Sequence, residues 1–204
     1  MHPNPTFHTA SNAENAAFAR DRAFGVLAIA DKGAPLVAHV PFVLAEDGKT
    51  ADLHLVRSNP IARALKAPMT ARIVVSGPDS YVSPDWYGVQ DQVPTWNYVA
   101  VHLTGTLELR PQEELRDLLD RQSALFETRL LPKPPWTAGK MDADALARMM
   151  RMIVPCRMQV TGMDGTWKLG QNKPDDVRAA AADHIDGYGM GAEFRTLAAL
   201  MRGV

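Results

Sequence analysis

The sequence has a single cysteine, Cys156, so it cannot form an intrachain disulfide. One thiol in 204 residues indicates a reducing compartment, and we expect a cytoplasmic protein with Cys156 buried in an apolar strand. No apolar run approaches the ~20 residues that a membrane helix requires, so no membrane association is expected. The polar, proline-rich segment Met1–Pro5 shows no features of a signal peptide.

The sequence also lacks an excess of either charge, with 22 basic and 23 acidic residues and no run of like charge. This balance argues against a dominant face for DNA phosphates and leaves only a local patch in a dimer. No nucleophile elbow, Walker loop or Gly-x-Gly-x-x-Gly turn is present, so a Rossmann domain is not supported.

Short strands joined by turns dominate the pattern. Asp47-Gly48 is a turn signal between two apolar runs, and Gly105 inside a strand indicates a bulge or a close backbone approach. We expect strands to end at the breakers Gly77-Pro78 and Asp164-Gly165, with brief further pairing at 167–169. The predicted strands are 24–30, 36–45, 52–56, 70–76, 98–109 and 154–161. Antiparallel strands in this order predict an α+β, mainly β protein built on a small barrel of about six strands with flanking helices.

Helix signals lie between and after these strands. Ser11 and Glu14 have the capping-box spacing, and Ser58 or Asn59 precedes Pro60 as a helix cap. The predicted helices are 12–21, 60–67, 111–131, 142–152, 174–186 and 194–201. The last of them is amphipathic, which is typical of packing on its own domain or on a partner subunit.

Tryptophan and tyrosine gather in the segments Tyr81–Tyr87 and Val93–Tyr98. Each ring has an apolar body and a polar tip, so the cluster suits a flat, partly polar ligand or a subunit interface. An aromatic core patch beneath a loop is the alternative.

Three histidines, His39, His54 and His102, lie in separate predicted strands. Three imidazoles could hold a metal, but no carboxylate or cysteine accompanies them in a signature. Packed or ligand-facing histidines fit better, and no metal is predicted.

The segment Val56–Pro60 places a basic residue and two small polar residues between a strand and a helix. The guanidinium of Arg57 and the hydroxyl of Ser58 could bind an anion such as phosphate. A simple helix cap is the alternative.

Five segments together resemble the PaiB family, the FMN-binding negative transcriptional regulators, over about residues 1–186. They occur in the family's order: His39-Val-Pro-Phe42, His54–Pro60, Gly77–Tyr87, Val93–Tyr98 with Val101-His102 and Gly105, and Gly165–Pro174. One departure is Gly170, where the family form Lys-Leu-Ser-Gln-Asn has serine.

The resemblance implies an FMN-binding split barrel related in fold to pyridoxamine-phosphate oxidases. It also implies a homodimer that holds FMN between its subunits. The expected domains are a split barrel over 1–173, with inserted helices at about 111–131 and 142–152, and a C-terminal helical extension over 174–204.

The resemblance further implies a set of flavin contacts. Arg57, Ser58 and Asn59 would meet the FMN phosphate, with Arg63 as a helper. From the neighbouring strands, the ring would be lined by His39, Val40, Pro41, His54 and Val56. From the partner subunit, Trp96, Tyr98 and His102 would cover the flavin, and Trp167, Lys168 and Gln171 would reach its polar rim.

Three functions follow from this resemblance. The first is a negative transcriptional regulator whose flavin occupancy or redox state changes what the dimer binds, although no basic recognition helix is visible and DNA binding could be indirect. The second is a flavin-dependent oxidoreductase acting on a small molecule, with the aromatic segment 81–98 as the substrate wall and His102 or Tyr98 as proton donor. The third is a haem-binding split barrel with a histidine ligand.

Overall fold

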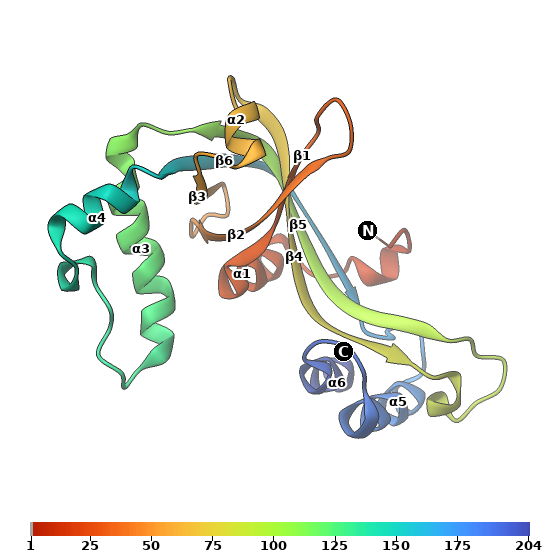
Figure 1. The fold of residues 1–204 in the computed structure, drawn as a ribbon. Helices are drawn as coiled ribbons and strands as arrows, with labels where there is room; N and C mark the ends of the chain where they lie inside the picture. The colour runs from red at the N-terminus through yellow and green to blue at the C-terminus, as the bar shows by residue number, and fades with distance from the viewer. Residues whose placement is uncertain (1) are drawn as a thin grey trace. The chain divides into compact units, whose positions relative to one another are not determined.

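Six antiparallel strands close into a barrel in the order β1-β2-β3-β6-β5-β4 in the computed structural model, which describes residues 2–204 (Figure 1). This order confirms the predicted barrel and fold class. The strands are β1 (Phe24–Ile29), β2 (Leu36–Leu44), β3 (Thr50–Val56), β4 (Met69–Val82), β5 (Thr95–Leu109) and β6 (Ile153–Lys168).

Six α-helices flank the barrel strands, each close to its predicted position apart from α2, which ends early. They are α1 (Asn12–Arg22), α2 (Pro60–Ala64), α3 (Leu115–Glu127), α4 (Ala143–Met150), α5 (Asp175–Tyr188) and α6 (Phe194–Arg202). The 3-10 turns are η1 (Pro5–Phe7), η2 (Pro84–Tyr87), η3 (Gln112–Glu114), η4 (Thr128–Leu130) and η5 (Ala138–Lys140). None of the helices in residues 2–204 combines the length and the apolar character needed to span a bilayer.

The predicted helix starts are confirmed by their hydrogen bonds. Ser11 N donates to Glu14 Oε2 at 2.8 Å and Glu14 N donates to Ser11 Oγ at 3.2 Å, which is the reciprocal pattern of a capping box. Asn59, rather than Ser58, caps α2, because its Oδ1 accepts from Ile61 N at 2.9 Å.

Two predicted strand ends are wrong. Strand β4 continues through Gly77-Pro78, and both residues are buried. Its pairing with β1 ends at Val74, and further along Asp79 N and Tyr81 N donate to the carbonyls of Ala192 and Met190. Proline removes only one donor from a strand, so the chain stays extended where other bonds hold it.

The second wrong end is Asp164-Gly165, through which β6 continues to Lys168. Gly165 makes no turn there. A Cβ at this position would lie 1.9 Å from Asn15 Oδ1, so the glycine is needed for close packing. The same reasoning confirms the prediction for Gly105, where a Cβ would lie 2.0 Å from the Gln159 carbonyl oxygen.

Two compact units divide the chain. Unit 1 contains the segment that ends at Asn15, together with Val75–His102 and Asp164–Val204. Unit 2 contains Ala16–Val74 and Leu103–Met163. The division predicted at residue 173 follows the sequence pattern alone and remains a prediction.

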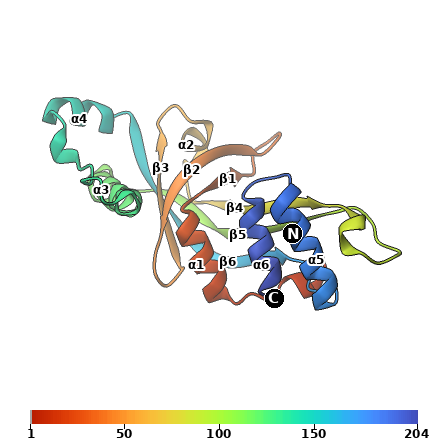
Figure 2. The same ribbon diagram turned by 90° about the horizontal axis from the view of Figure 1, so that it is seen from below.

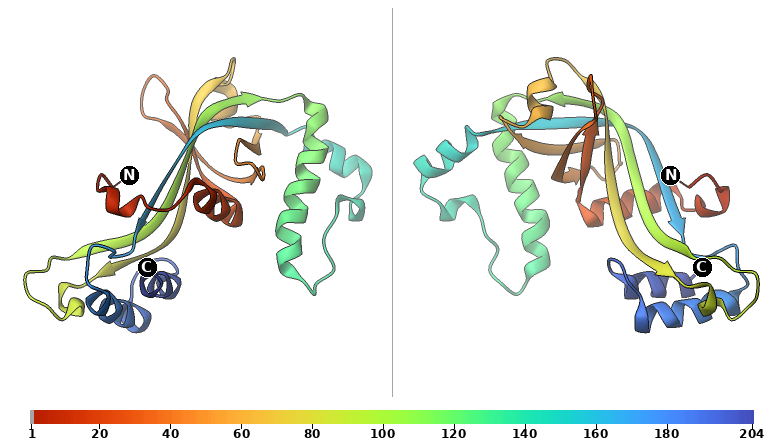
Figure 3. Two further views of the ribbon diagram at one scale, coloured as in Figure 1. Left: turned by 180° about the vertical axis from the view of Figure 1, so that it is seen from behind. Right: turned by 45° about the vertical axis from the view of Figure 1, so that its right-hand side comes forward.

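The core of unit 2 follows the two-residue period of its strands. Leu27, Phe42, Leu53, Ile73 and Met158 come from five different strands and are fully buried. Burial of each such side chain stabilises the folded state by about 1.5–3 kcal/mol. Figure 3 shows α3 and α4 of this unit with the segment that joins them.

In unit 1, α5 and α6 lie side by side (Figure 2). Leu197, Ala198 and Met201 form the buried face of α6, as its amphipathic pattern predicts. The buried Arg178 of α5 donates through Nε to the Met201 carbonyl at 2.8 Å. The C-terminal helices therefore pack on each other within unit 1.

Candidate functional site

The predicted flavin contacts fall into two groups, one in each unit. The group in unit 2 lies on β2, on β3 and in the turn to α2. The group in unit 1 lies on β5 and at the end of β6.

On β2, the three predicted residues do not share a face. Val40 is only 3% exposed and its side chain belongs to the core, so a ligand could reach no more than its backbone. His39 is exposed and stacks with Phe24, with ring centroids 6.4 Å apart and planes at 28°. The exposed aromatic pair is the part of this strand that could contact a flat ring.

On β3, His54 and Val56 share the face opposite the buried Leu53 and Leu55. Helix α3 packs on this strand, and the pKa of His54 lies below its ordinary value because burial outweighs the opposing effect of the Gln122 side chain. His54 Nδ1 and Gln122 Nε2 are both buried and have no hydrogen-bond partner among the described residues. The sequence pattern missed Gln122, because a glutamine on a helix carries no signal for its partner.

The turn after β3 holds Arg57 in place through neutral oxygens. Arg57 Nε donates to the Arg151 carbonyl at 2.6 Å, and Nη2 donates to Gln112 Oε1 at 2.6 Å. No carboxylate pairs with this guanidinium within residues 2–204, so its charge remains available to an anion. Ser58 and Arg63 are exposed beside it, whereas the Asn59 side chain is used to cap α2.

Strand β5 in unit 1 places Trp96, Tyr98 and His102 on one face, opposite the buried Asn97, Val99 and Val101. Trp96 is 43% exposed, and its Nε1 donates to Asp79 Oδ1 at 3.3 Å. The alternation therefore places all three side chains on one face of β5, as cover for a flavin would require.

At the end of β6, all three predicted residues have hydrogen-bond partners. Trp167 Nε1 donates to Asn15 Oδ1 at 2.8 Å. Gln171 Oε1 accepts from Leu169 N at 2.9 Å, and its Nε2 donates to the Trp167 carbonyl at 2.5 Å, so this side chain closes its own turn. Gly170 has a φ of +84°, which explains glycine in place of the family's serine.

Lys168 is half-buried, and burial lowers the pKa of its ammonium group. Its Nζ donates to Thr95 Oγ1 and, at 2.8 Å, to the Trp96 carbonyl. These acceptors are neutral, so Lys168 brings a charge that a bound anion would stabilise.

The three histidines that suggested a metal site do not form one. No group of three or more His, Cys, Asp or Glu side chains suited to a metal occurs in the part of the chain that the structure describes. Cys156 is 1% exposed, as predicted, and burial raises the pKa of its thiol to about 12.

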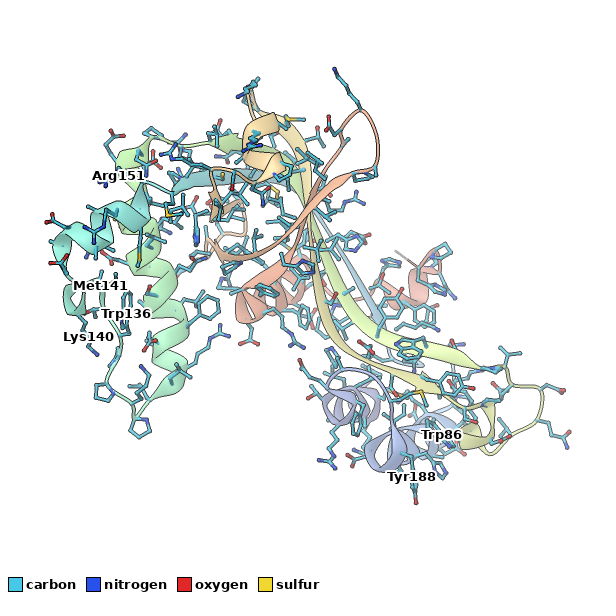
Figure 4. All side chains as sticks on the ribbon, in the orientation of Figure 1. Trp86, Trp136, Lys140, Met141, Arg151 and Tyr188 are labelled. Atoms are coloured by element: carbon cyan, nitrogen blue, oxygen red, sulfur yellow. The ribbon has the colours of Figure 1, made fainter. Side chains whose placement is uncertain are left out.

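The aromatic segment 81–98 is used largely for packing within unit 1. The Trp86 ring stacks on His184 of α5, with centroids 5.9 Å apart and planes at 16°. Tyr87 is buried, and Tyr81 contacts both Trp86 and Trp96 edge to face. Figure 4 shows Trp86 beside the C-terminal helices.

Two kinds of comparison agree with this architecture. The chain is similar in fold to a solved FAD- and haem-binding protein from Mycobacterium smegmatis, with a TM-score of 0.57 and 17% identity over 84% of this chain and 78% of that chain. It is also similar to the conserved hypothetical protein Rv2991 from Mycobacterium tuberculosis, with a TM-score of 0.56 and 17% identity over 82% and 91% of the two chains. At these identities the likeness concerns the fold.

Sequence comparison is more specific. The chain is 28% identical over 172 residues to "Protease synthase and sporulation protein PAI 2" of Bacillus subtilis, covering 83% of this chain and 82% of that protein. A family model described as "Putative FMN-binding domain" matches residues 1–162. The predicted resemblance is therefore confirmed, and the chain belongs to the PaiB-type family of FMN-binding domains, whose cofactor is FMN.

Proposed function

We propose that the protein is a cytoplasmic, homodimeric flavin-binding regulator of the PaiB type, in which FMN occupancy or redox state controls what the dimer binds. The family and its cofactor support flavin binding. The regulatory role is inferred from the resemblance to the PaiB regulators. The single, buried cysteine supports a reducing compartment.

The observation that carries the flavin assignment is the set of hydrogen bonds that holds the Arg57 guanidinium. Its guanidinium is held by two neutral oxygens, pairs with no carboxylate within residues 2–204, and belongs to the residue just before the exposed Ser58. A planar cation held in this way is suited to a phosphate monoester such as that of FMN. Bound FMN would supply reversible one- or two-electron chemistry.

The residues of the two strand faces fit the rest of the cofactor. In unit 2, His39 with Phe24 offers ring contacts, and His54, whose Nδ1 has no hydrogen-bond partner among the described residues, offers a polar contact. We assign Val40 and Pro41 to backbone contact and Val56 to apolar contact. Trp96, Tyr98, His102, Trp167, Lys168 and Gln171 would come from the second subunit of the dimer.

Exposed apolar side chains on unit 2 support self-association. Phe24, Val37 and Val56 are each about half exposed or more, on neighbouring strands β1, β2 and β3. Several exposed apolar side chains gathered in one sheet are typical of surfaces that become covered by a partner. Light scattering coupled to gel filtration would give the mass of the particle, and a monomer at micromolar concentration would contradict the dimer.

Flavin titration of two variants tests the phosphate assignment. Arg57→Glu is expected to abolish FMN binding while affecting riboflavin affinity far less, because riboflavin has no phosphate. Arg148→Glu reverses the charge of an exposed arginine on α4 and is the matched control, expected to bind FMN as the unmodified protein does. Equal loss of both ligands in Arg57→Glu would instead place Arg57 in the fold or at the ring.

Regulation and catalysis are separated by two further measurements on the FMN-loaded protein. We expect salt-dependent DNA binding that changes between oxidised and reduced flavin, and no steady-state oxidation of NADH or NADPH. Turnover without DNA binding would favour the flavin-dependent oxidoreductase. A Soret band in place of flavin bands would favour the haem-binding alternative.

A further inference from the structure

A cavity of about 310 Å³ lies entirely within unit 1. Its walls come from the N-terminal segment, from the chain between η2 and β5, and from the turn after β6. This volume is at the small end of the range for ligand sites, which is roughly 300–1,000 Å³.

Both lysines of unit 1, Lys168 and Lys173, line this cavity. The five other lysines of the chain, at positions 32, 49, 66, 133 and 140, all belong to unit 2. Two ammonium groups therefore converge on one small space.

Within residues 2–204, neither ammonium group forms an ion pair with a carboxylate. Lys168 Nζ donates to Thr95 Oγ1 and to the Trp96 carbonyl. Lys173 Nζ donates to Gln92 Oε1 and lies 5.2 Å from the centre of the Tyr87 ring. An ammonium has three N–H donors, so each lysine keeps donor capacity for a ligand.

Asn97 adds a buried polar group to the same cavity. It is 1% exposed, and its Nδ2 has the Met201 sulfur at 3.6 Å as partner, which is a weak acceptor. A buried amide donor with so poor a partner is better satisfied by a ligand oxygen.

The remaining lining sets the charge and shape of the ligand. Asp91 is the one carboxylate among the lining residues, so two ammonium groups and one carboxylate leave one net positive charge. The rings of Phe7 and Tyr87 and the side chain of Val93 supply apolar wall. A monoanion with a flat apolar body matches both properties.

We propose that this cavity binds a small aromatic carboxylate, whose carboxyl group is held by Lys168, Lys173 and Asn97. The site goes beyond the proposed flavin function, although Lys168 belongs to both assignments. Lys173 and Asn97 have no place in the flavin assignment, so changes at Lys173 test the cavity separately from FMN.

Calorimetric titration of the full chain without added flavin tests the proposal, using benzoate and its neutral isostere benzamide as probes. We expect benzoate to bind at least about tenfold more tightly than benzamide, which corresponds to one strong charge-assisted contact. Lys173→Met and Lys168→Met should each weaken benzoate binding by about tenfold or more, whereas Lys66→Met in unit 2 should leave it unchanged.

A charge-retaining variant separates the loss of the positive charge from a loss of the fold. Lys173→Arg should keep benzoate affinity within a few-fold, and circular dichroism melting would show whether Lys173→Met still folds. Equal binding of benzoate and benzamide, no benzoate binding, or unchanged affinity in a folded Lys173→Met would overturn the proposal. Tighter binding of inorganic phosphate than of benzoate would overturn the carboxylate class.

The two proposals fail in distinguishable ways. Loss of benzoate binding in Lys173→Met with normal FMN binding supports an anion site that needs Lys173 when FMN binding does not. A protein that takes up no FMN but still binds benzoate through Lys173 would contradict the flavin assignment only.

Discussion

Trp167 and Asn15 are joined by a hydrogen bond of 2.8 Å from the indole Nε1 to the side-chain oxygen Oδ1. That same oxygen lies only 1.9 Å from the position that a Cβ on Gly165 would occupy. The indole contact therefore depends on a glycine two residues earlier in β6.

Replacing Gly165 by alanine is expected to break this arrangement. The new methyl group must displace the buried Asn15, and we expect the free energy of unfolding to fall by about 1–3 kcal/mol. Urea unfolding followed by tryptophan fluorescence measures this change. Gly162→Ala in the same strand is the control, because nothing lies within 4 Å of the added Cβ; an equal loss in both variants would show that the cost comes from the strand and not from Asn15.

The ion pairs of Asp52 in unit 2 make the stability of the fold depend on pH in the acid range. Burial raises the pKa of Asp52, but hydrogen bonds and charge from Arg157 and Arg121 outweigh it and hold the pKa below its ordinary value. Arg157 Nε lies 2.6 Å from Asp52 Oδ1, and Arg121 Nη2 lies 2.9 Å from Oδ2.

Because the pKa is lower in the folded state, Asp52 stabilises the fold above the unfolded pKa of about 3.9. This contribution is lost as the pH falls through the folded pKa. Asp52→Asn should lower the free energy of unfolding by about 1–3 kcal/mol at neutral pH. Below about pH 4, the stability of the variant and that of the unmodified protein should become more alike, because Asp52 is then protonated in the unmodified protein. Thermal melts from pH 3 to pH 7 would measure both effects, and Asp120→Asn on the exposed Arg116 pair should change stability by less than about 0.5 kcal/mol.

Cys156 is expected to resist thiol reagents in the folded protein. Burial raises the pKa of its thiol to about 12, so almost no thiolate is present near neutral pH. A chromogenic disulfide should label less than a tenth of the protein in native buffer within roughly an hour and one equivalent after urea unfolding. Rapid labelling of native protein would contradict the buried position of the thiol.

Trp86 tests whether the aromatic segment is used for packing or for ligand binding. Trp86→Ala removes the stack on His184 and should lower the free energy of unfolding by about 2 kcal/mol, below the cost for a fully buried tryptophan. Hydrogen exchange should show faster opening of α5, with FMN affinity unchanged. Trp136→Ala in unit 2, labelled in Figure 4 on the segment between α3 and α4, should leave α5 exchange unaltered.

The barrel could be predicted from the sequence because its strands follow a two-residue period and its helices begin at recognisable caps. Asn59 and Ser11 illustrate this, since each acts through backbone groups only two or three residues away. Gly77-Pro78 and Asp164-Gly165 were misinterpreted because their role depends on distant segments. The carbonyl of Ala192 holds β4 extended, and Asn15 occupies the space over Gly165.

The site shows the same limit. Strand alternation accounts for the shared face of His54 and Val56 and for that of Trp96 and Tyr98. It could not indicate that Val40 would face the core, that Gln122 would meet His54, or that Gln171 would close its own turn. Nothing in the sequence around Lys173 indicates its neighbours, and only the fold brings it to the cavity that Lys168 also lines.

The division into two units has a consequence for how such a chain can change over time. Three separate segments make unit 1 and two make unit 2, so no single break in the chain separates them. Recombination at one point therefore cannot exchange either unit as a whole for its counterpart in another gene. Exchange of either unit would need several crossovers at matching positions, so the two units are expected to be inherited together.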